Sequence, residues 1–278
     1  MEKTMEIIIL LENNRIDPQF KSKHGLSILI RHNGKNILLD TGPDGKFLQN
    51  ARKMNIDLAD ADMLFLSHSH YDHTGGLNVF CKINNNAPIY LMDKIDNKYY
   101  AKRKLYFIPI GLSVKNKYRS RITQLDNDLH IDNGIYFIKN AVSINQKPDS
   151  NKCLFKKGIN GKIPDSFDHE GILVLEENNE LAVFNSCSHN GLMNIIETVE
   201  SKIPNKKIRS YVGGLHLSNP GMKAHENNDY LDTLIERIIQ KDINIYTGHC
   251  TGKYALEYMK NGLNDKFREI NSGMKLGI

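Results

Sequence analysis

The sequence predicts a mixed α/β fold, because short apolar runs with strand character interleave with amphipathic helical segments. Residues 63–66 are all apolar, as expected for a short buried strand. An Asn33-Gly34 pair between two early runs is a strong hairpin signal. An amphipathic helix over residues 228–240 precedes a strand at 243–246. Because α/β folds of 278 residues can form one domain, we expect a single domain over residues 1–278.

The remaining elements are predicted from the same two patterns, short apolar runs for strands and amphipathic spacing for helices. Residues 93–125 fit no single period, and we expect an insert there, either a lid or dimer contact beside the active site or a surface excursion. Residues 144–164 are polar and glycine-rich, so we expect a long loop. Hairpin turns are expected at Asp132-Asn133-Gly134 and Asn178-Asn179. Further strands are expected at residues 6–11, 26–31, 36–40, 88–92, 172–175, 181–184 and 209–212, and further helices at 46–54, 76–81, 192–199 and from 253.

Composition favours a soluble globular protein. Hydrophobic residues make up 40% of the chain and charged residues 25%, which is ordinary for a globular protein. The net charge of +5 comes from scattered lysines, which favours a solvated surface over nucleic-acid binding and is compatible with an anionic small substrate. No signal-peptide pattern or long apolar run occurs, and none of the cysteines forms a Cys-x-x-Cys pair. We therefore expect a cytoplasmic protein with no membrane partner, and free thiols at Cys81, Cys153, Cys187 and Cys250.

Three histidines and an aspartate crowd the segment that follows the strand at 63–66. Residues two apart in an extended segment point the same way, so His68 and His70 can present imidazoles to one point. A turn then brings Asp72 and His73 back toward the same place. Imidazole suits zinc and iron, and carboxylate adds a harder ligand. A solvated polar turn would explain one histidine but not this cluster, so the segment predicts two adjacent metal sites.

Three later histidines each follow a predicted strand, where they are placed like the first cluster. His189 is expected to be a fifth metal ligand, with a helix-capping role as the alternative. His216 can bind metal, donate a proton, contact substrate or simply fill a loop. His249 lies in a strand, glycine, histidine, helix sequence and is expected to be the last ligand. The remaining histidines lack such settings and are expected to be ordinary surface or loop residues: His24, His32, His130, His169 and His225.

The run Ser-His-x-His-x-Asp-His-x-Gly-Gly at residues 67–76 resembles the signature of the metallo-β-lactamase fold superfamily. The resemblance implies a four-layer αβ/βα sandwich of two mixed sheets with helices outside, which binds one or two metal ions at its edge. It also implies that Asp40, in Leu-Asp-Thr-Gly, supports a ligand histidine, although an aspartate in a turn before a helix fits locally as well. The runs Cys-Ser-His-Asn-Gly, Gly-Gly-Leu-His-Leu and Gly-His-Cys-Thr-Gly are similar to the branch that includes the archaeal dihydropterin synthase of methanopterin biosynthesis.

One position departs from the common pattern of that superfamily. Many members place a bridging aspartate just after the strand predicted at 181–184, where this chain has Cys187 or Ser188. Whether a bridged two-metal centre forms is therefore open. Cys187 can itself serve as a thiolate ligand, because metals deprotonate thiols. Cys250 is interpreted as structural.

The leading hypothesis for function is a metal-dependent hydrolase. One or two divalent ions, zinc first with manganese and iron as alternatives, would bind water and lower its pKa so that it attacks a phosphoryl or acyl centre. Asp72 would accept the proton of the water, and His216 would position or protonate the leaving group. A phosphorylated substrate is favoured by the basic insert, which also suggests a homodimer contact.

Three alternatives remain open. The first is a transferase similar to dihydropterin synthase, in which an aniline-type carbon attacks instead of water. The second is an iron-dependent redox enzyme, although the di-iron relatives carry a glutamate where this chain has His70. The third is a metal-retaining sensor without turnover.

Overall fold

The computed structural model describes residues 5–131, 134–219, 221 and 224–278. The chain divides into two compact units. The first unit comprises Met1–Tyr99, Pro109–Leu129 and Ile270–Ile278, and the second comprises Tyr100–Ile108 and His130–Glu269. The expectation of a single domain stays a prediction.

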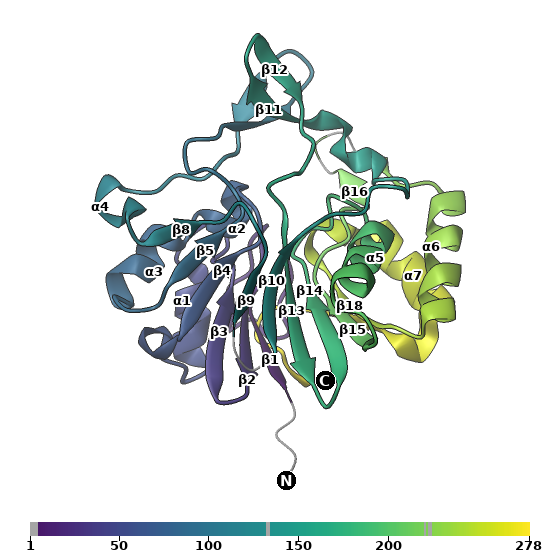
Figure 1. Ribbon diagram of the computed structural model, residues 1–278, viewed down its shortest axis with the longest axis horizontal. Coiled ribbons are helices and arrows are strands. Elements are labelled where there is room, and N and C mark those ends of the chain that lie inside the picture. Colours follow the sequence, from purple (N-terminus) through teal and green to yellow (C-terminus); the bar gives the residue numbers. More distant parts are fainter. Residues whose placement is uncertain (1–4, 132–133, 220, 222–223) are drawn as a thin grey trace. The chain divides into compact units, whose positions relative to one another are not determined.

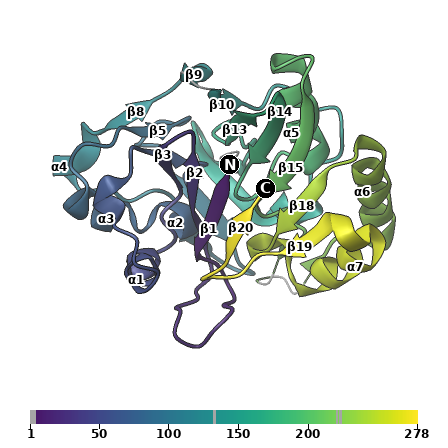
Figure 2. The same ribbon diagram turned by 90° about the horizontal axis from the view of Figure 1, so that it is seen from below.

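A seven-stranded mixed sheet forms the centre of the first unit (Figure 1). The strands from β20 to β3 pair antiparallel with their neighbours. From β3 to β8 the neighbouring strands are parallel. Figure 2 shows the C-terminal strand β20 beside β1. The order is β20 (Lys275–Gly277), β1 (Glu6–Leu11), β2 (Ser27–His32), β3 (Lys35–Leu39), β4 (Met63–Leu66), β5 (Ile89–Leu91) and β8 (Ile122–Gln124).

Helices α1 (Lys46–Lys53) and α3 (Leu77–Ile83) pack on one face of this sheet. Phe47 and Ala51 of α1 and Phe80 of α3 are fully buried against alternate strand residues such as Leu38 and Leu64. This contact is what the apolar spacing of the helices requires. The shorter helices of the unit are the 3₁₀ helix η1 (Leu58–Asp60), α2 (Tyr71–Thr74) and α4 (Asn116–Arg119).

The second unit also has a seven-stranded mixed sheet. Its β13–β14 hairpin turns at Asn178 and Asn179, whose φ angles of 51° and 65° are the left-handed values that a type I′ turn needs. From β14 onward the neighbouring strands are parallel. The order is β19 (Phe267–Glu269), β18 (Asn244–Thr247), β15 (Lys207–Val212), β14 (Glu180–Phe184), β13 (Gly171–Glu177), β10 (Ile135–Lys139) and β9 (Leu129–Ile131).

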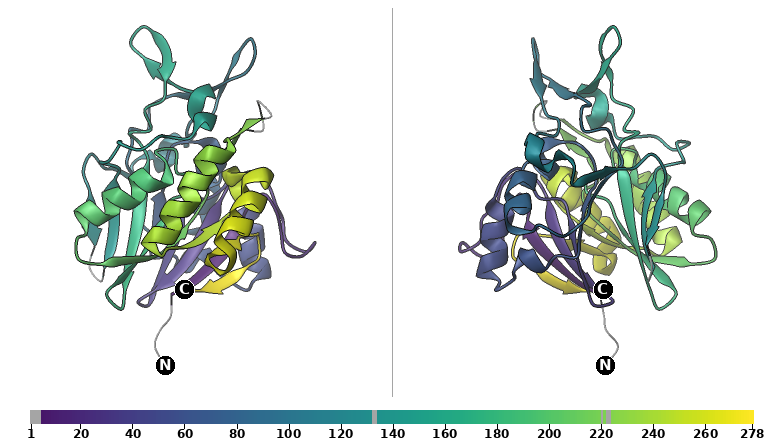
Figure 3. Two further views of the ribbon diagram at one scale, coloured as in Figure 1. Left: turned by 90° about the vertical axis from the view of Figure 1, so that its right-hand side faces the viewer. Right: turned by 60° about the vertical axis from the view of Figure 1, so that its left-hand side comes forward.

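Three helices lie side by side over one face of the second sheet (Figure 3). They are α5 (Leu192–Lys202), α6 (Asn228–Lys241) and α7 (Lys253–Leu263). Their buried residues join strand residues in one apolar cluster, and Asn227 caps α6 by accepting a hydrogen bond from the Tyr230 amide. The 3₁₀ helices of the unit are η2 (Asp149–Cys153), η3 (His249–Thr251) and η4 (Asn264–Lys266).

A four-stranded sheet and a two-stranded ladder complete the secondary structure of the described residues. The former has the order β12 (Gly161–Pro164), β11 (Leu154–Gly158), β6 (Tyr99–Lys102) and β7 (Phe107–Pro109), and the latter pairs β16 (Ser218–Asn219) with β17 (Ala224–His225). The expectation of a long loop over residues 144–164 is therefore wrong. All four residues of β12 are exposed, and an exposed strand needs none of the apolar residues by which strands are recognised.

The other element predictions largely agree with the structure. The α/β class is confirmed, and each expected strand and helix has a counterpart within a few residues. Strand β20 was not expected from the sequence, and its pairing with β1 joins opposite ends of the chain. The turn predicted at Asp132-Asn133-Gly134 separates neighbouring strands β9 and β10, but residues 132 and 133 lie outside the described residues. The structure of the described residues has no helix long and apolar enough to cross a membrane.

The core of the first unit gives a testable stability prediction. Phe80 is fully buried in α3, so Phe80→Ala should lower the free energy of unfolding by about 3–5 kcal/mol through lost apolar contact and a residual cavity. Lys82→Ala, an exposed change on the same helix, should be nearly neutral. Urea unfolding followed by circular dichroism measures both. Equal stability of the two variants would contradict this packing.

Candidate metal centre

Polar residues of the first unit follow strands that run parallel. Asp40 follows β3, His68 follows β4 and Asp93 follows β5. The carboxyl ends of parallel strands lie at the same edge of a sheet, where α/β proteins place their ligands. Distant parts of the sequence are therefore brought to one place by the topology of the sheet.

At this edge of the sheet, the carboxylate of Asp40 accepts hydrogen bonds from two neighbouring residues. Its Oδ1 accepts a hydrogen bond from the Ser67 amide at 2.8 Å, and its Oδ2 accepts from Ser67 Oγ at 2.6 Å. The same Oδ2 lies 2.8 Å from Nδ1 of His73. All three residues are completely buried. Since an ionised carboxylate can only accept, the Nδ1 of His73 carries the proton in this contact.

A second contact extends the same pattern to His68. Its Nδ1 lies 2.9 Å from Ser67 Oγ, whose own proton goes to Asp40. His68 therefore donates from Nδ1, as His73 does, and both keep a basic Nε2. The two rings lie with centroids 4.3 Å apart, and one ligand atom from each of Asp40, His68 and His73 lies within 4.8 Å of the others. Such carboxylate-supported imidazoles are characteristic of metal sites.

His70 and Asp72 lie beside these two imidazoles. The Nδ1 of His70 is 3.1 Å from Nε2 of His68, and Oδ2 of Asp72 is 3.5 Å from Nε2 of His73. The first unit thus brings together all four of its sequence-predicted ligands. His24, expected to be an ordinary residue, places its Nε2 3.3 Å from Asp72 Oδ2.

The turn that carries these residues is held by its backbone. The Thr41 amide and hydroxyl both donate to the carbonyl of His73, at 2.8 and 3.0 Å. A Cβ on Gly76 would lie 2.3 Å from the carbonyl oxygen of Thr41, so only glycine permits this approach. The Gly-Gly pair of the motif therefore has a steric role.

Asp93 and Tyr99 are part of the site region but gave no recognisable signal in the sequence. Asp93 accepts hydrogen bonds from the hydroxyl groups of Ser69 and Tyr99, the latter at 2.9 Å. The Tyr99 ring meets His70 edge-on, with centroids 5.9 Å apart. These contacts join residues up to 29 positions apart, so no local pattern could reveal them.

In the second unit, the predicted residues lie in loops that follow β14, β15 and β18. These strands are adjacent and parallel, so their carboxyl ends share one edge. Ser188, His216 and His249 have φ angles of 53°, 49° and 52°, a left-handed conformation that is uncommon outside glycine. Non-glycine residues in this region cluster at functional sites.

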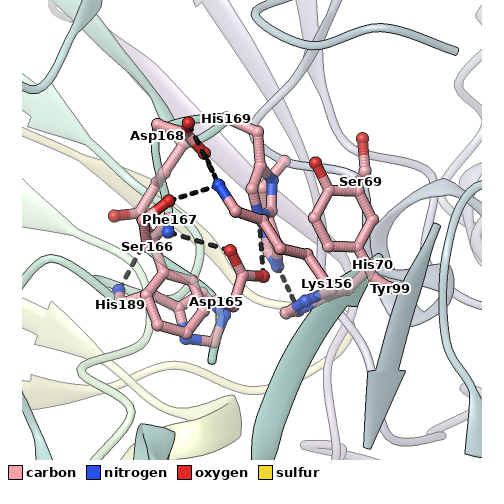
Figure 4. A network of polar contacts seen from close by, with 12 residues as sticks. Ser69, His70, Tyr99, Lys156, Asp165, Ser166, Phe167, Asp168, His169 and His189 are labelled. Atoms are coloured by element: carbon pink, nitrogen blue, oxygen red, sulfur yellow. Dashed lines mark hydrogen bonds and ion pairs between the residues drawn. The ribbon is translucent and has the colours of Figure 1, made fainter. Parts of the chain in front are cut away.

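His189 is held on several sides (Figure 4). Its Nδ1 is 2.9 Å from Oδ1 of Asn151, and its ring stacks on Phe167 with centroids 4.5 Å apart and planes 6° from parallel. Its amide donates to Glu170 at 2.8 Å. Burial raises the pKa of the Glu170 carboxyl, although hydrogen bonds from Asn190 and His189 oppose the shift. None of these three supports was anticipated from the sequence.

Two further contacts between oppositely charged or polar side chains stabilise the loop that carries Phe167, one of them buried. Asp165 accepts from the Phe167 amide at 2.9 Å and lies 3.1 Å from Nε2 of His169. Lys156 contacts Asp168 at 3.0 Å (Figure 4). Burial alone would raise the pKa of Asp168, but the hydrogen bond and charge of Lys156, together with Ser166 and His169, outweigh it, and the pKa lies below its ordinary value. His169 lies in a loop, as expected, but it is buried against Asp165. His32 was also expected in a loop or at the surface, but it is buried at the end of β2.

His216 and both nearby cysteines also lie at the carboxyl edge of the second sheet. The ring centroids of His216 and His189 are 4.2 Å apart. Cys187 and Cys250 are buried. Burial raises the pKa of the Cys250 thiol, but the neighbouring Cys187 and the imidazole of His216 outweigh it, and the pKa lies well below its usual range. The four cysteines form no disulfide bond in the part of the chain that the structure describes.

Comparison with known proteins shows which family and fold the chain resembles. Residues 23–143, which span β3, β4 and the histidine cluster, match the family model of the metallo-β-lactamase superfamily. This segment of the chain is therefore similar to a metallo-β-lactamase superfamily domain. Among solved structures, it resembles that of Tm1679, a metal-dependent hydrolase of the β-lactamase superfamily, with 25% identity, coverage of 99% of both chains and a TM-score of 0.82. The chain therefore has the metallo-β-lactamase fold.

Two relatives from Methanocaldococcus jannaschii span almost the whole chain. One is 7,8-dihydropterin-6-methyl-4-(β-D-ribofuranosyl)-aminobenzene-5′-phosphate synthase, 27% identical over 269 residues that cover 91% of this chain and 90% of that protein. The other is an uncharacterised protein, 26% identical over 260 residues that cover 90% of this chain and 92% of that protein. The likeness to the synthase branch inferred from the four histidine motifs is thus found over the full domain.

The role of Asp40 can be tested by its effect on metal affinity. Asp40→Asn keeps the shape of the side chain but removes the charge that fixes the protonated Nδ1 of His73. Loss of such a supporting carboxylate should weaken zinc binding by about 10- to 100-fold. Competition with a chromophoric chelator measures the affinity, and Asp60→Asn, at an exposed aspartate of η1, is the control. Unchanged affinity in Asp40→Asn would show that the carboxylate does not support a ligand.

Proposed function

We propose that this protein is a metal-dependent hydrolase whose cation is held in the first unit by His68, His70, Asp72 and His73. The observation that carries the proposal is the shared dependence of His68 and His73 on Asp40. It fixes both imidazoles in the tautomer with a basic Nε2, the form that binds metal. A purely structural histidine cluster gains nothing from this arrangement.

The contributions of the second unit remain proposals from the sequence. His189 and His249 are the further ligands that the strand-end pattern predicts. Asn151 supports the same role for His189, because an imidazole that donates from Nδ1 keeps Nε2 for a cation. Zinc is the favoured metal, and manganese and iron remain the alternatives.

A divalent cation at such a site activates water and stabilises negative charge that develops on the substrate. The chain itself supplies the proton transfers. Asp72 is partly exposed, and its Oδ2 lies 3.5 Å from Nε2 of His73 and 3.3 Å from Nε2 of His24. We propose that it accepts a proton from the attacking water. The assignment of His216 as a proton donor to the leaving group stays a prediction.

A phosphate-bearing substrate is supported by the charges of the four-stranded sheet. Neither residues 99–109 nor residues 154–164 include an acidic residue. Lys162 lies over the rings of Tyr100 and Phe107, with Nζ 4.7 and 4.8 Å from their centroids. Cation and aromatic groups of this kind can bind phosphate and a ring. The basic residues of the sheet and its turns are Lys102, Arg103, Lys104, Lys156, Lys157 and Lys162.

A transferase related to dihydropterin synthase is the second candidate. The observation in its favour is the 27% identity to the archaeal synthase over nine-tenths of both chains. In that reaction an aniline-type carbon would replace water as the nucleophile, while the same residues hold the cation. Cytoplasmic location and a homodimer contact through residues 93–125 are further proposals, and the redox enzyme and the sensor remain alternatives from the sequence.

Loss of one ligand should separate metal binding from folding. His68→Ala removes a buried imidazole of the cluster, so hydrolysis of phosphomonoesters and phosphodiesters should fall to the uncatalysed rate, with bound metal reduced. Circular dichroism should show an unchanged secondary structure. His130→Ala, at an exposed histidine, should keep both activity and metal. Full activity of the His68→Ala protein would eliminate the proposed site.

The two reactions can be separated with one pair of substrates. Incubation with a dihydropterin diphosphate alone should release phosphate or diphosphate if water is the nucleophile. Release that requires an aminobenzene ribosyl phosphate, together with formation of a coupled product seen by mass spectrometry, would establish the transferase and exclude hydrolysis as the main activity.

A further inference from the structure

Two hairpins of the four-stranded sheet end in exposed apolar side chains. The first joins β6 to β7, and its turn is closed by a hydrogen bond of 2.8 Å from the Arg103 amide to the Tyr106 carbonyl oxygen. The second joins β11 to β12, with Gly158 paired to Gly161. Residues 100–108 and 154–164 belong to the second unit, and both views of Figure 3 show the two hairpin tips at the top. The tips therefore face the same side of this unit.

The apolar side chains at the tips gain almost no burial from the fold. Leu105 and Ile159 are 96% and 102% exposed, and Tyr106 is 62% exposed. Hairpin turns favour glycine, asparagine and aspartate, which suit both the backbone of the turn and its contact with water. One exposed apolar residue is ordinary, but three at tips that face the same side form a group. A contact outside the chain explains their apolar character.

The charge around the tips has a single sign. Residues 99–109 and 154–164 contain no aspartate or glutamate, whereas they contain six lysine and arginine residues. Lys156 is paired with Asp168 at 3.0 Å, and the other five form no ion pair with a carboxylate of the described residues. Lys104 and Lys157, close in sequence to the apolar tip residues, are exposed. Uncompensated positive charge therefore flanks the apolar tips.

A lipid bilayer with anionic headgroups matches this combination of groups. Aliphatic side chains gain free energy when they enter the boundary between headgroups and acyl chains, and tyrosine is enriched at the same depth. Lysine and arginine beside them attract the anionic lipids, and their long side chains extend to the lipid phosphates. A bilayer also requires no surface of complementary shape.

Two other kinds of partner match the tips less well. A lasting protein interface buries about 800 Å² on each partner, which is more than a few side chains on two narrow turns provide. Single-stranded nucleic acid binds through cations and stacked aromatic rings. Leu105 and Ile159 offer it neither of these groups.

We propose that the tips of the β6–β7 and β11–β12 hairpins dock on an anionic lipid bilayer. Leu105, Tyr106 and Ile159 enter the headgroup boundary, and the basic residues of the two hairpins contact lipid phosphates. This peripheral contact needs no membrane-spanning helix, and it revises the expectation of no membrane partner, which depended on the lack of a long apolar run. The proposal does not rest on hydrolase activity, because neither hairpin contains a candidate metal ligand.

Tryptophan fluorescence tests the insertion of a tip directly, because the chain contains no tryptophan. Leu105→Trp in the full-length protein places a single probe at one tip. Ile144→Trp, at an 83% exposed residue of the second unit outside both hairpins, is the matched control. With vesicles of equal parts phosphatidylcholine and phosphatidylglycerol, the emission of Leu105→Trp should shift to shorter wavelength, and that of Ile144→Trp should not. Phosphatidylcholine alone should give a much smaller shift.

Cosedimentation with the same vesicles measures the apolar contribution to binding. The double variant Leu105→Ser, Ile159→Ser should bind anionic vesicles at least about tenfold more weakly than the unmodified protein, because it loses both aliphatic tips. Ile144→Ser should bind as the unmodified protein does. All of these side chains are exposed, so the substitutions should not impair folding.

The electrostatic contribution is tested separately. The double variant Lys104→Glu, Lys157→Glu should also bind at least about tenfold more weakly, and added salt should weaken the binding of the unmodified protein. Lys253→Glu, at an exposed lysine of α7, is the matched control and should keep the affinity.

Four results would overturn the proposal. The first is the absence of binding to anionic vesicles at low salt, and the second is full binding by the Leu105→Ser, Ile159→Ser variant. The third is an emission shift of Leu105→Trp that follows protein concentration without vesicles, which would assign the tips to contact with a second copy of the chain. The fourth is a shift with a single-stranded oligonucleotide but not with vesicles, which would assign them to nucleic acid.

Discussion

The buried carboxylate of Asp40 is the interaction on which the candidate centre depends. It accepts the Ser67 amide, the Ser67 hydroxyl and Nδ1 of His73, so its charge is fully engaged although no solvent reaches it. A buried charge is tolerated only with such partners. In return, it sets the proton positions of His73 directly and of His68 through Ser67. The metal-binding form of both rings is therefore built into the folded first unit and does not have to be selected when a cation arrives.

The two units use the same construction. Each has a sheet that changes from antiparallel to parallel pairing, and each places its chemistry at the carboxyl ends of the parallel strands. Irregular backbone is concentrated there: Asp40 in the first unit, and Ser188, His216 and His249 in the second, all have left-handed φ angles. The apolar clusters between helices and sheets carry the stability that permits this local strain. The candidate functional residues of both units thus lie in loops and short helices on a rigid support.

The sequence predicted the ligands that are neighbours in the chain, but not the contacts between distant segments. His68, His70, Asp72 and His73 are neighbours in the chain, so their spacing alone predicts their convergence. The stacking of Phe167 on His189 and the bonds of Asn151 and Glu170 to the same residue join segments 19 to 38 positions apart, and no periodicity records such contacts. The exposed hairpin of β11 and β12 was missed for another reason: its lysine-rich strands bury little, so they lack the apolar alternation of a half-buried strand.

The claim common to this account is that the chain is a metalloprotein. The most direct measurement is the metal content per chain, by inductively coupled plasma mass spectrometry, of protein purified without chelators or a nickel column. We expect at least one equivalent of zinc, manganese or iron per chain, retained through gel filtration. Protein that is folded yet carries no transition metal, and takes up none when zinc is added, would contradict it.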